Sequence, residues 1–354
     1  MAEVSDSWQQ SEHGYTYGVY GTPTTLQLAS RIADIEGARH TFLTPGGQSA
    51  IALIYLSFCT AGAHVLLPTT AYKPNAELGQ GLLKRLNIEV EPYDPLLGSD
   101  IARLIRPETA LIWCESPGSI TMEVQDVPAI VEAAHARNVP VALDNTYGAG
   151  VLFDAFSFGV DVSMQALTKY VGGHSDLLLG SVSVGTEAAY MQVGETHGQL
   201  GMAVSPDDCS LALRGLQTLG VRLEALERST LAVAAWLAQR PEVSSVLHPA
   251  VPGSPGHSVW RRDFKGSASV FSILFAPRYT TAQVNGFVNA LKLFKIGWSW
   301  GGVHSLAIAY PLLDRLDKRQ AGGIVRLNIG LEDCSDLIED LTGAFASLED
   351  EDGG

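Results

Sequence analysis

Apolar residues in the first half of the chain follow two alternating patterns. Helical spacing occurs at residues 25–37, 48–60 and 126–138, where the last segment has Asp126 as N-cap and Pro128 in its first turn. Short apolar runs predict strands at 63–68, 88–93, 109–115 and 139–145. Strands separated by helices imply right-handed crossovers, so this half predicts a mostly parallel sheet flanked by helices. Such sheets bind ligands at the carboxyl ends of their strands.

The second half has a different order of elements. Residues 207–240 predict one or two long helices, and strand-like runs dominate after Pro241. These runs lie at 243–249, 267–275, 304–310 and 324–330, with helical stretches near 281–292 and 335–348. Strands mixed with a few helices predict a smaller α+β domain. We therefore expect a short N-terminal arm (1–20), a large domain (21–215) and a small C-terminal domain (216–354).

Composition narrows the class of protein. The 354 residues are 46% hydrophobic and 17% charged, which is typical of a globular chain of about two domains. A formal net charge of −15 argues against nucleic acid or an anionic membrane as the main partner. The four cysteines lie far apart without C-x-x-C spacing, so neither a metal site nor a disulfide framework is expected. No signal peptide and no apolar run of about 18 residues occur, which predicts a cytoplasmic protein.

Three segments carry candidate chemistry. Lys169 follows an apolar run and precedes a Gly-Gly and His-Ser-Asp loop, where partial loss of solvent would lower its pKa and make the amine a nucleophile. Asp144 ends a buried run, and its carboxylate could hold a protonated cofactor ring nitrogen. Residues 44–51 (TPGGQSAI) place glycines before a helix, whose free N–H groups suit a phosphate.

Each of these segments also has an ordinary interpretation. A lone lysine usually lies on the surface, a strand-end aspartate is often a cap or turn residue, and Gly-Gly before a helix is usually only a turn. In combination and in this chain order, they form the set of groups that pyridoxal phosphate (PLP) requires. No GxxxxGK[ST] or GxGxxG motif occurs, which argues against a nucleoside triphosphate or a dinucleotide as ligand.

Over about residues 15 to 348, the chain resembles the Cys/Met-metabolism group of fold-type I PLP-dependent enzymes. The most specific segments are YGVYGTPTTLQL, TTAYKPN, ESPGSITMEVQDVPAIV, DNTYGAGVLF, SMQALTKYVGGHSD, RGLQTLGVRL, SWGGVHSL and VRLNIGLED. ESPGSITMEVQDVPAI and SWGG resemble the cystathionine β-lyase branch more than the γ-lyase or γ-synthase branches. The resemblance implies a carbon–sulfur lyase that cleaves cystathionine or related cysteine S-conjugates to a thiol (homocysteine), pyruvate and ammonia. The alternatives are γ-elimination or γ-replacement, and a non-catalytic relative that only binds the cofactor.

The same resemblance implies roles for single residues. Lys169 would bind the cofactor covalently and transfer protons, Tyr72 would stack on the cofactor ring and assist, and Asp144 would pair with the ring nitrogen. The cofactor phosphate would be held by backbone N–H groups of Gly47 and Gln48, the Thr168 hydroxyl and Tyr17 of a neighbouring subunit.

Substrate binding and assembly are also implied. Arg326 would clamp the substrate α-carboxylate together with Ser299 and Trp300, and Tyr17 would lie close to the substrate. Because Tyr17 would serve the site of a neighbour, each site needs a dimer, and the resemblance favours a homotetramer built from two active dimers. The partner is then a small amino acid, and no metal is expected.

The sequence departs from the family pattern where the distal part of a substrate would lie. The family has an arginine two residues after the tyrosine, and this chain has Val19, followed by Tyr20. Ser210 matches a tyrosine that is usual in the substrate channel, and the N-terminal arm is shorter than in the family. These differences bear on the thiol leaving group more than on the elimination, so we expect relaxed selectivity for cystathionine.

Overall fold

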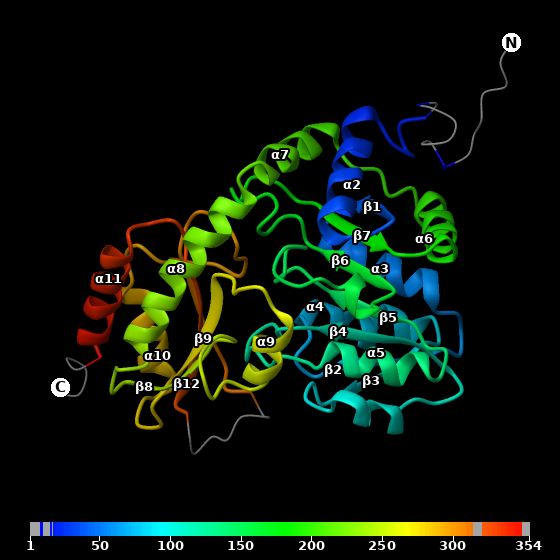
Figure 1. The fold of residues 1–354 in the computed structure, drawn as a ribbon. Coiled ribbons are helices and arrows are strands. Elements are labelled where there is room, and N and C mark those ends of the chain that lie inside the picture. Colours follow the sequence, from blue (N-terminus) through cyan, green and yellow to red (C-terminus); the bar gives the residue numbers. More distant parts are fainter. Residues whose placement is uncertain (1–7, 10–14, 16, 314–320, 349–354) are drawn as a thin grey trace, which may run out of the picture.

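Two β-sheets organise the protein (Figure 1). The structure is a computed structural model, and it describes residues 8–9, 15, 17–313 and 321–348. Most of the expected arm at 1–20 and the last six residues lie outside the described residues. In Figure 1 the larger sheet with α2 to α6 lies beside the smaller sheet with α8, α10 and α11. Within the described segments, no helix is both long enough and apolar enough to cross a membrane.

The larger sheet has seven strands in the order β1-β7-β6-β5-β4-β2-β3. β3, β2, β4, β5 and β6 run parallel, while β7 is antiparallel to both of its neighbours. The strands are β1 (His40–Thr44), β2 (His64–Pro68), β3 (Glu89–Tyr93), β4 (Thr109–Glu115), β5 (Val141–Asp144), β6 (Val162–Gln165) and β7 (Gly180–Val184). The expectation of a mostly parallel sheet is confirmed.

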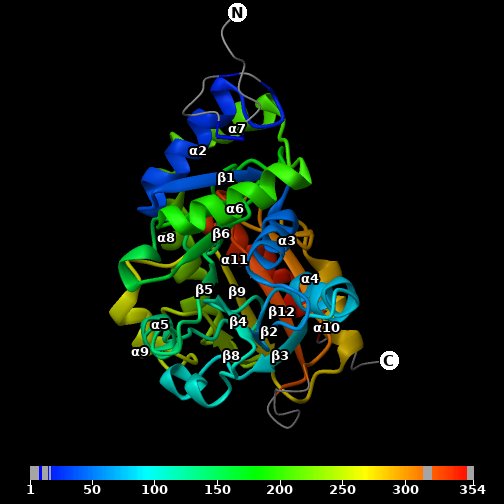
Figure 2. The same cartoon turned by 90° about the vertical axis from the view of Figure 1, so that its right-hand side faces the viewer.

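Helices cover both faces of this sheet (Figure 2). Clusters of buried side chains join α3 and α6 to one face and α5 to the opposite face. The helices are α2 (Pro23–Glu36), α3 (Gly47–Phe58), α4 (Lys73–Leu78), α5 (Val127–His135), α6 (Glu187–Leu200) and α7 (Pro206–Leu216), with short helical turns at Gly79–Leu83, Gly98–Arg103 and Phe156–Phe158.

The helix expected at 126–138 is present but shorter. The Asp126 carboxylate accepts a hydrogen bond from Ala129 N at 3.2 Å, so Asp126 is the N-cap. α5 ends at His135, because Asn138 takes a left-handed φ of 57° and Pro140 follows.

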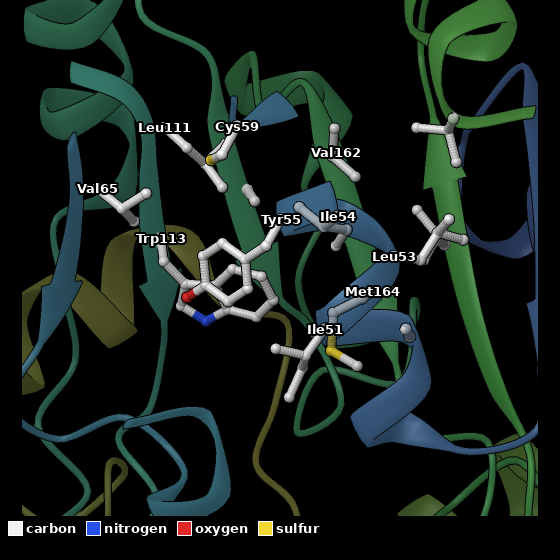
Figure 3. Close-up of a cluster of buried hydrophobic side chains, with 14 of the residues drawn as sticks. Ile51, Leu53, Ile54, Tyr55, Cys59, Val65, Leu111, Trp113, Val162 and Met164 are labelled. Carbon is white, nitrogen blue, oxygen red and sulfur yellow. The ribbon is translucent and has the colours of Figure 1, made fainter. Parts of the chain in front are cut away.

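The packing of α3 against the larger sheet fixes the position of its N-terminus, which borders the cavity described below. Its apolar residues Ile51, Ile54 and Tyr55 are buried against the sheet (Figure 3). The Tyr55 ring stacks on Trp113 of β4, with ring centroids 5.2 Å apart. Burial of such side chains contributes about 1.5–3 kcal/mol each, so this contact holds α3 firmly on β2, β4 and β6.

Several elements were not expected from the sequence, among them the strands β1, β7 and β10 and the helices α6 and α9. β1 and β7 are five residues each and carry buried serines and threonines, such as Ser181 and Ser183, in place of an apolar run. α6 contains Gly194 and Gly198, which weaken a helical pattern. Both glycines face Trp8, and a Cβ on Gly194 would lie only 2.2 Å from the indole. The glycines are therefore needed for this close approach.

The smaller sheet has the order β10-β11-β12-β9-β8 and is antiparallel except for the pair β10 and β11. Its strands are β8 (Val243–Leu247), β9 (Val270–Phe275), β10 (Lys295–Ile296), β11 (Leu306–Tyr310) and β12 (Gly323–Asn328), and its helices are α8 (Leu219–Leu237), α9 (His257–Asp263), α10 (Thr281–Ala290) and α11 (Cys334–Ala346). The smaller α+β unit is confirmed. α7 contacts α2, whereas α8 contacts α11 and β8. The division between residues 215 and 216 stays a prediction.

Candidate active site

A cavity of about 310 Å³ opens at the carboxyl ends of β4 and β5 and at the N-terminus of α3. Strand ends and loops form its wall, because parallel sheets bind ligands at the carboxyl ends of their strands. It brings together most of the residues predicted from the sequence: Gly47, Gln48, Tyr72, Asp144, Thr168, Lys169, Ser299 and Trp300. Residues more than 250 positions apart in the sequence therefore meet in one place.

Lys169 lies in the turn after β6, four residues beyond the end of the strand. Its Nζ donates a hydrogen bond to Ser299 Oγ at 2.7 Å and lies 5.2 Å from the centroid of the Trp300 ring. Burial and the charge of Arg326 lower the pKa of Lys169 to about 8, while Asp144 acts in the opposite direction. The lysine therefore has a substantial neutral fraction near neutral pH, which a nucleophilic amine requires.

This lowered pKa predicts how the protein takes up an aldehyde cofactor. Only the neutral amine attacks a carbonyl carbon, so the rate at which cofactor-free protein binds PLP should rise with pH and level off above about 8. The measurement is the growth of the absorption of lysine-bound cofactor across a pH series. Nα-acetyl-lysine is the control, because its ordinary pKa near ~10.4 places the rise at higher pH. The same midpoint for protein and control would contradict the desolvated amine.

Asp144 has a partner that the sequence analysis did not identify. Asp144 ends β5, Glu115 ends β4, and the two residues are direct partners in the parallel ladder. Glu115 is buried, and burial and the charge of Asp144 raise its pKa well above the ordinary range. Burial also raises the pKa of Asp144, whereas hydrogen bonds from Thr146 and the charge of Lys169 lower it. Glu115 is thus the member that retains its proton, and Asp144 is the member that carries charge.

Glu115 also fixes the position of Tyr72. Its Oε2 accepts a hydrogen bond from the backbone N of Tyr72 at 2.6 Å, where the chain enters α4. The Tyr72 side chain is 43% exposed, and burial together with the charge of Asp144 raises its pKa. Tyr72 therefore keeps its hydroxyl proton at neutral pH and presents a ring at the cavity.

The N-terminus of α3 offers an anion site. Gly47 and Gln48 are the first two residues of the helix, whose backbone N–H groups have no acceptor within the helix. A Cβ on Gly47 would lie 2.8 Å from the Cβ of Ala166, so only glycine fits here. The Gln48 side chain donates to Pro74 O at 3.1 Å, which leaves the backbone of Gln48 for a ligand. The Thr168 hydroxyl, also at the cavity, donates to Leu179 O at 3.2 Å.

Arg326 lies behind the wall of the cavity. It is 6% exposed on β12, with Nη2 donating to Trp298 O at 2.6 Å and Nη1 to Ser119 O at 3.3 Å. Both carbonyls belong to residues that line the cavity, although the Arg326 side chain is not part of the lining. Neither partner neutralises the guanidinium, so its charge remains for an anion such as a carboxylate.

Tyr17 does not line this cavity in the single chain. Its ring is 60% exposed and packs edge-on against Tyr20, with centroids 5.7 Å apart. Val19 and Tyr20 line a separate cavity of about 290 Å³ beside α2 and β1, and Ser210 is exposed on α7. A role of these residues at the substrate therefore requires a second subunit and stays a prediction.

These groups match the functional groups of PLP one by one. The amine of Lys169 complements an aldehyde, the carboxylate of Asp144 a protonated ring nitrogen, and the N-terminus of α3 a phosphate. The ring of Tyr72 offers a surface for stacking. The residues present therefore fit PLP, and the fold and site together define the class of fold-type I PLP-dependent enzymes.

The comparisons place the chain within that class. The model of the family "Cys/Met metabolism PLP-dependent enzyme" matches residues 1–346, and the chain belongs to this family. It is 44% identical over 338 residues to a putative cystathionine β-lyase of Rhizobium johnstonii, which covers 94% of this chain and 85% of the relative. It is 41% identical over 340 residues to the cystathionine β-lyase MetC of Escherichia coli, covering 94% and 86%. A crystal structure of cystathionine γ-synthase from Xanthomonas oryzae pv. oryzae, in complex with aminoacrylate and cysteine, superposes with a TM-score of 0.89 at 27% identity, covering 99% and 92%. PLP is therefore the cofactor of this protein.

Proposed function

We propose that the protein is a PLP-dependent carbon–sulfur β-lyase. It eliminates a thiol from cystathionine or a related cysteine S-conjugate and leaves pyruvate and ammonia. The observation that carries this proposal is the identity of 41–44% with β-lyases over nearly the whole chain. The γ-synthase shares the fold at only 27% identity, so the fold alone does not separate the two reactions.

The site residues divide the work of an α,β-elimination. Bound PLP stabilises negative charge on the α-carbon of an amino acid attached to it. Asp144 holds the ring nitrogen protonated, which this stabilisation requires. Arg326 binds the α-carboxylate and orients the α-proton toward Lys169. The neutral amine of Lys169 accepts that proton at Nζ, and the hydrogen bond with Ser299 holds Nζ in place.

Tyr72 acts as an acid in this scheme. Its raised pKa keeps the phenol protonated, so it can donate a proton to the sulfur as the thiolate leaves. Glu115 acts as a positioning residue in this scheme, because it holds the backbone of Tyr72.

The products decide between β- and γ-elimination. We expect the loaded enzyme to convert L-cystathionine to pyruvate and homocysteine in equal amounts, measured by lactate dehydrogenase and a thiol reagent. Formation of 2-oxobutyrate and cysteine would replace the proposal with γ-elimination. Loading with PLP but no keto acid from any cysteine S-conjugate would identify a non-catalytic relative.

We infer that the enzyme works as a homo-oligomer in the cytoplasm, and that two subunits share each site. The four cysteines are unpaired, which is consistent with a reducing compartment. A tetramer built from two active dimers follows from the family resemblance, and its mass in solution can be measured directly.

A mixing experiment tests the shared site. Tyr17→Ala and Lys169→Ala subunits are each expected to be inactive alone. A mixed dimer contains one site with Lys169 from one subunit and Tyr17 from the other, so an equal mixture should recover about one quarter of the wild-type activity. Two tagged subunits purified together verify the exchange. Verified exchange without recovered activity would show that Tyr17 does not serve the neighbouring site.

A further inference from the structure

We propose that the preferred substrates carry an uncharged, apolar group on sulfur, an alkyl or aryl thiol, instead of the zwitterionic homocysteine half of cystathionine. This inference rests on the proposed β-elimination and specifies its substrate class. Three observations support it: the apolar mouth of the cavity, the lack of a second lysine or arginine among its described lining residues, and the composition of the N-terminal segment.

The mouth of the cavity is apolar. Leu178 and Trp298 are each 69% exposed and Tyr72 is 43% exposed, and all three line the cavity. Large apolar side chains that gather with this exposure around a cavity are typical of a ligand surface. The Trp298 ring packs edge-on against Tyr310 at 5.4 Å, and the backbone of Trp298 holds Arg326. The indole is therefore held beside the proposed carboxylate clamp.

The charged groups of the lining are already in use. They are Lys169 and Asp144, beside the protonated Glu115, and Arg326 lies just behind the wall. With its α-carboxylate on Arg326 and its α-carbon at Lys169, a substrate extends its sulfur substituent toward the mouth. The homocysteine half would bring a second carboxylate there, and among the described lining residues no further lysine or arginine receives it. A charge that loses water without a partner is unfavourable, whereas an apolar group gains from the same transfer.

The N-terminal segment does not supply the missing cation either. Residues 1–30 contain no lysine or arginine, and the first basic residue is Arg31. If this segment reaches a neighbouring site through Tyr17, it brings Val19 and Tyr20 with it. These side chains would extend the apolar surface formed by Leu178 and Trp298. The cavity lining and the N-terminal segment therefore both favour an apolar thiol as leaving group.

The test compares S-benzyl-L-cysteine, S-ethyl-L-cysteine and L-cystathionine on the loaded enzyme. Benzyl thiol and homocysteine are both alkyl thiols, so their leaving-group chemistry is matched and the distal groups differ. We expect kcat/KM for S-benzyl-L-cysteine to exceed that for cystathionine by about tenfold or more, as burial of a phenyl ring allows. Pyruvate from all three with cystathionine preferred would overturn this inference alone. Pyruvate from none would overturn the proposed function.

Variants locate the effect. Leu178→Ala and Trp298→Ala should each lower kcat/KM for S-benzyl-L-cysteine about fivefold to tenfold more than they lower kcat/KM for S-ethyl-L-cysteine. Ile296→Ala is the matched control, because Ile296 is 64% exposed nearby on β10 but does not line the cavity. Leu178→Lys should shift the preference toward cystathionine. Equal losses on all substrates in both alanine variants would contradict an apolar subsite.

Binding without turnover gives an independent measurement. L-2-amino-5-phenylpentanoate and L,L-2,7-diaminosuberate replace the sulfur of the benzyl substrate and of cystathionine by methylene, so neither can release a thiol. Calorimetric titration of the loaded enzyme should show the phenyl compound binding about tenfold tighter, with a more negative heat-capacity change. Tighter binding of the diaminosuberate would overturn the inference even if all three sulfur substrates were slow.

Discussion

Lys169→Ala should abolish turnover, with kcat at least about 10⁴-fold below the wild type, because the variant loses both the covalent attachment and the base. The neighbouring groups cannot replace it. Asp144 has the proposed role of holding the ring nitrogen, and Tyr72 has a raised pKa that keeps it an acid. PLP should still bind weakly through the N-terminus of α3.

Two measurements beyond activity check the role of Lys169. The absorption of lysine-bound cofactor should disappear, and borohydride reduction followed by peptide mass analysis should find no modified peptide. Lys265→Ala is the control, since Lys265 is an exposed lysine outside the cavity. A borohydride-fixed cofactor in the Lys169→Ala protein would assign the attachment to another residue.

Asp144→Asn should give the second largest effect, a fall in kcat of about 10²–10⁴-fold in a protein that remains loaded. The amide has nearly the same shape as the carboxylate, so the ring still fits. It has no negative charge to hold the ring nitrogen protonated, and the cofactor then stabilises the carbanion poorly. The effect therefore concerns the chemical step rather than cofactor content.

Cofactor content and kcat must be measured on the same sample to separate these effects. Asp207→Asn on α7 makes the same chemical change at an exposed position and should leave both unchanged. Near-wild-type kcat in fully loaded Asp144→Asn would refute the role. An N-methylated PLP analogue, whose ring nitrogen carries a permanent positive charge without the carboxylate, should restore part of the activity.

The sequence predicted the central elements because their signals are local. Asp144 and Lys169 each follow an apolar run, and the glycines at 46 and 47 precede a helix, so strand ends and a helix start could be assigned. Glu115 carries the same signal, a carboxylate at the end of the run TALIWCE, and could have been identified in the same way. Its pairing with Asp144 depends on strand order, which a single strand does not reveal.

Other features depend on contacts that no local pattern encodes. β1 and β7 are stabilised by each other and by β6, so their serines and threonines are buried in a ladder although the segments look polar. The exposed positions of Leu178 and Trp298 around one cavity arise from loops more than a hundred residues apart. The role of Tyr17 stays a prediction from the sequence, because its proposed site belongs to another subunit.

The close contact between Gly47 and Ala166 ties two functions to one rigid body. Ala166 lies three residues before Lys169, and Gly47 begins the helix that we propose binds the cofactor phosphate. The span between the anion-binding end and the backbone that carries Lys169 is therefore set by closely packed backbone segments, and only the lysine side chain can adjust the position of the amine. That span determines the length of cofactor that fits the site. A methyl group added at residue 47 would push the two segments apart, lengthen the span and reject the natural cofactor. Residue 47 is therefore a starting point for accepting a longer synthetic cofactor.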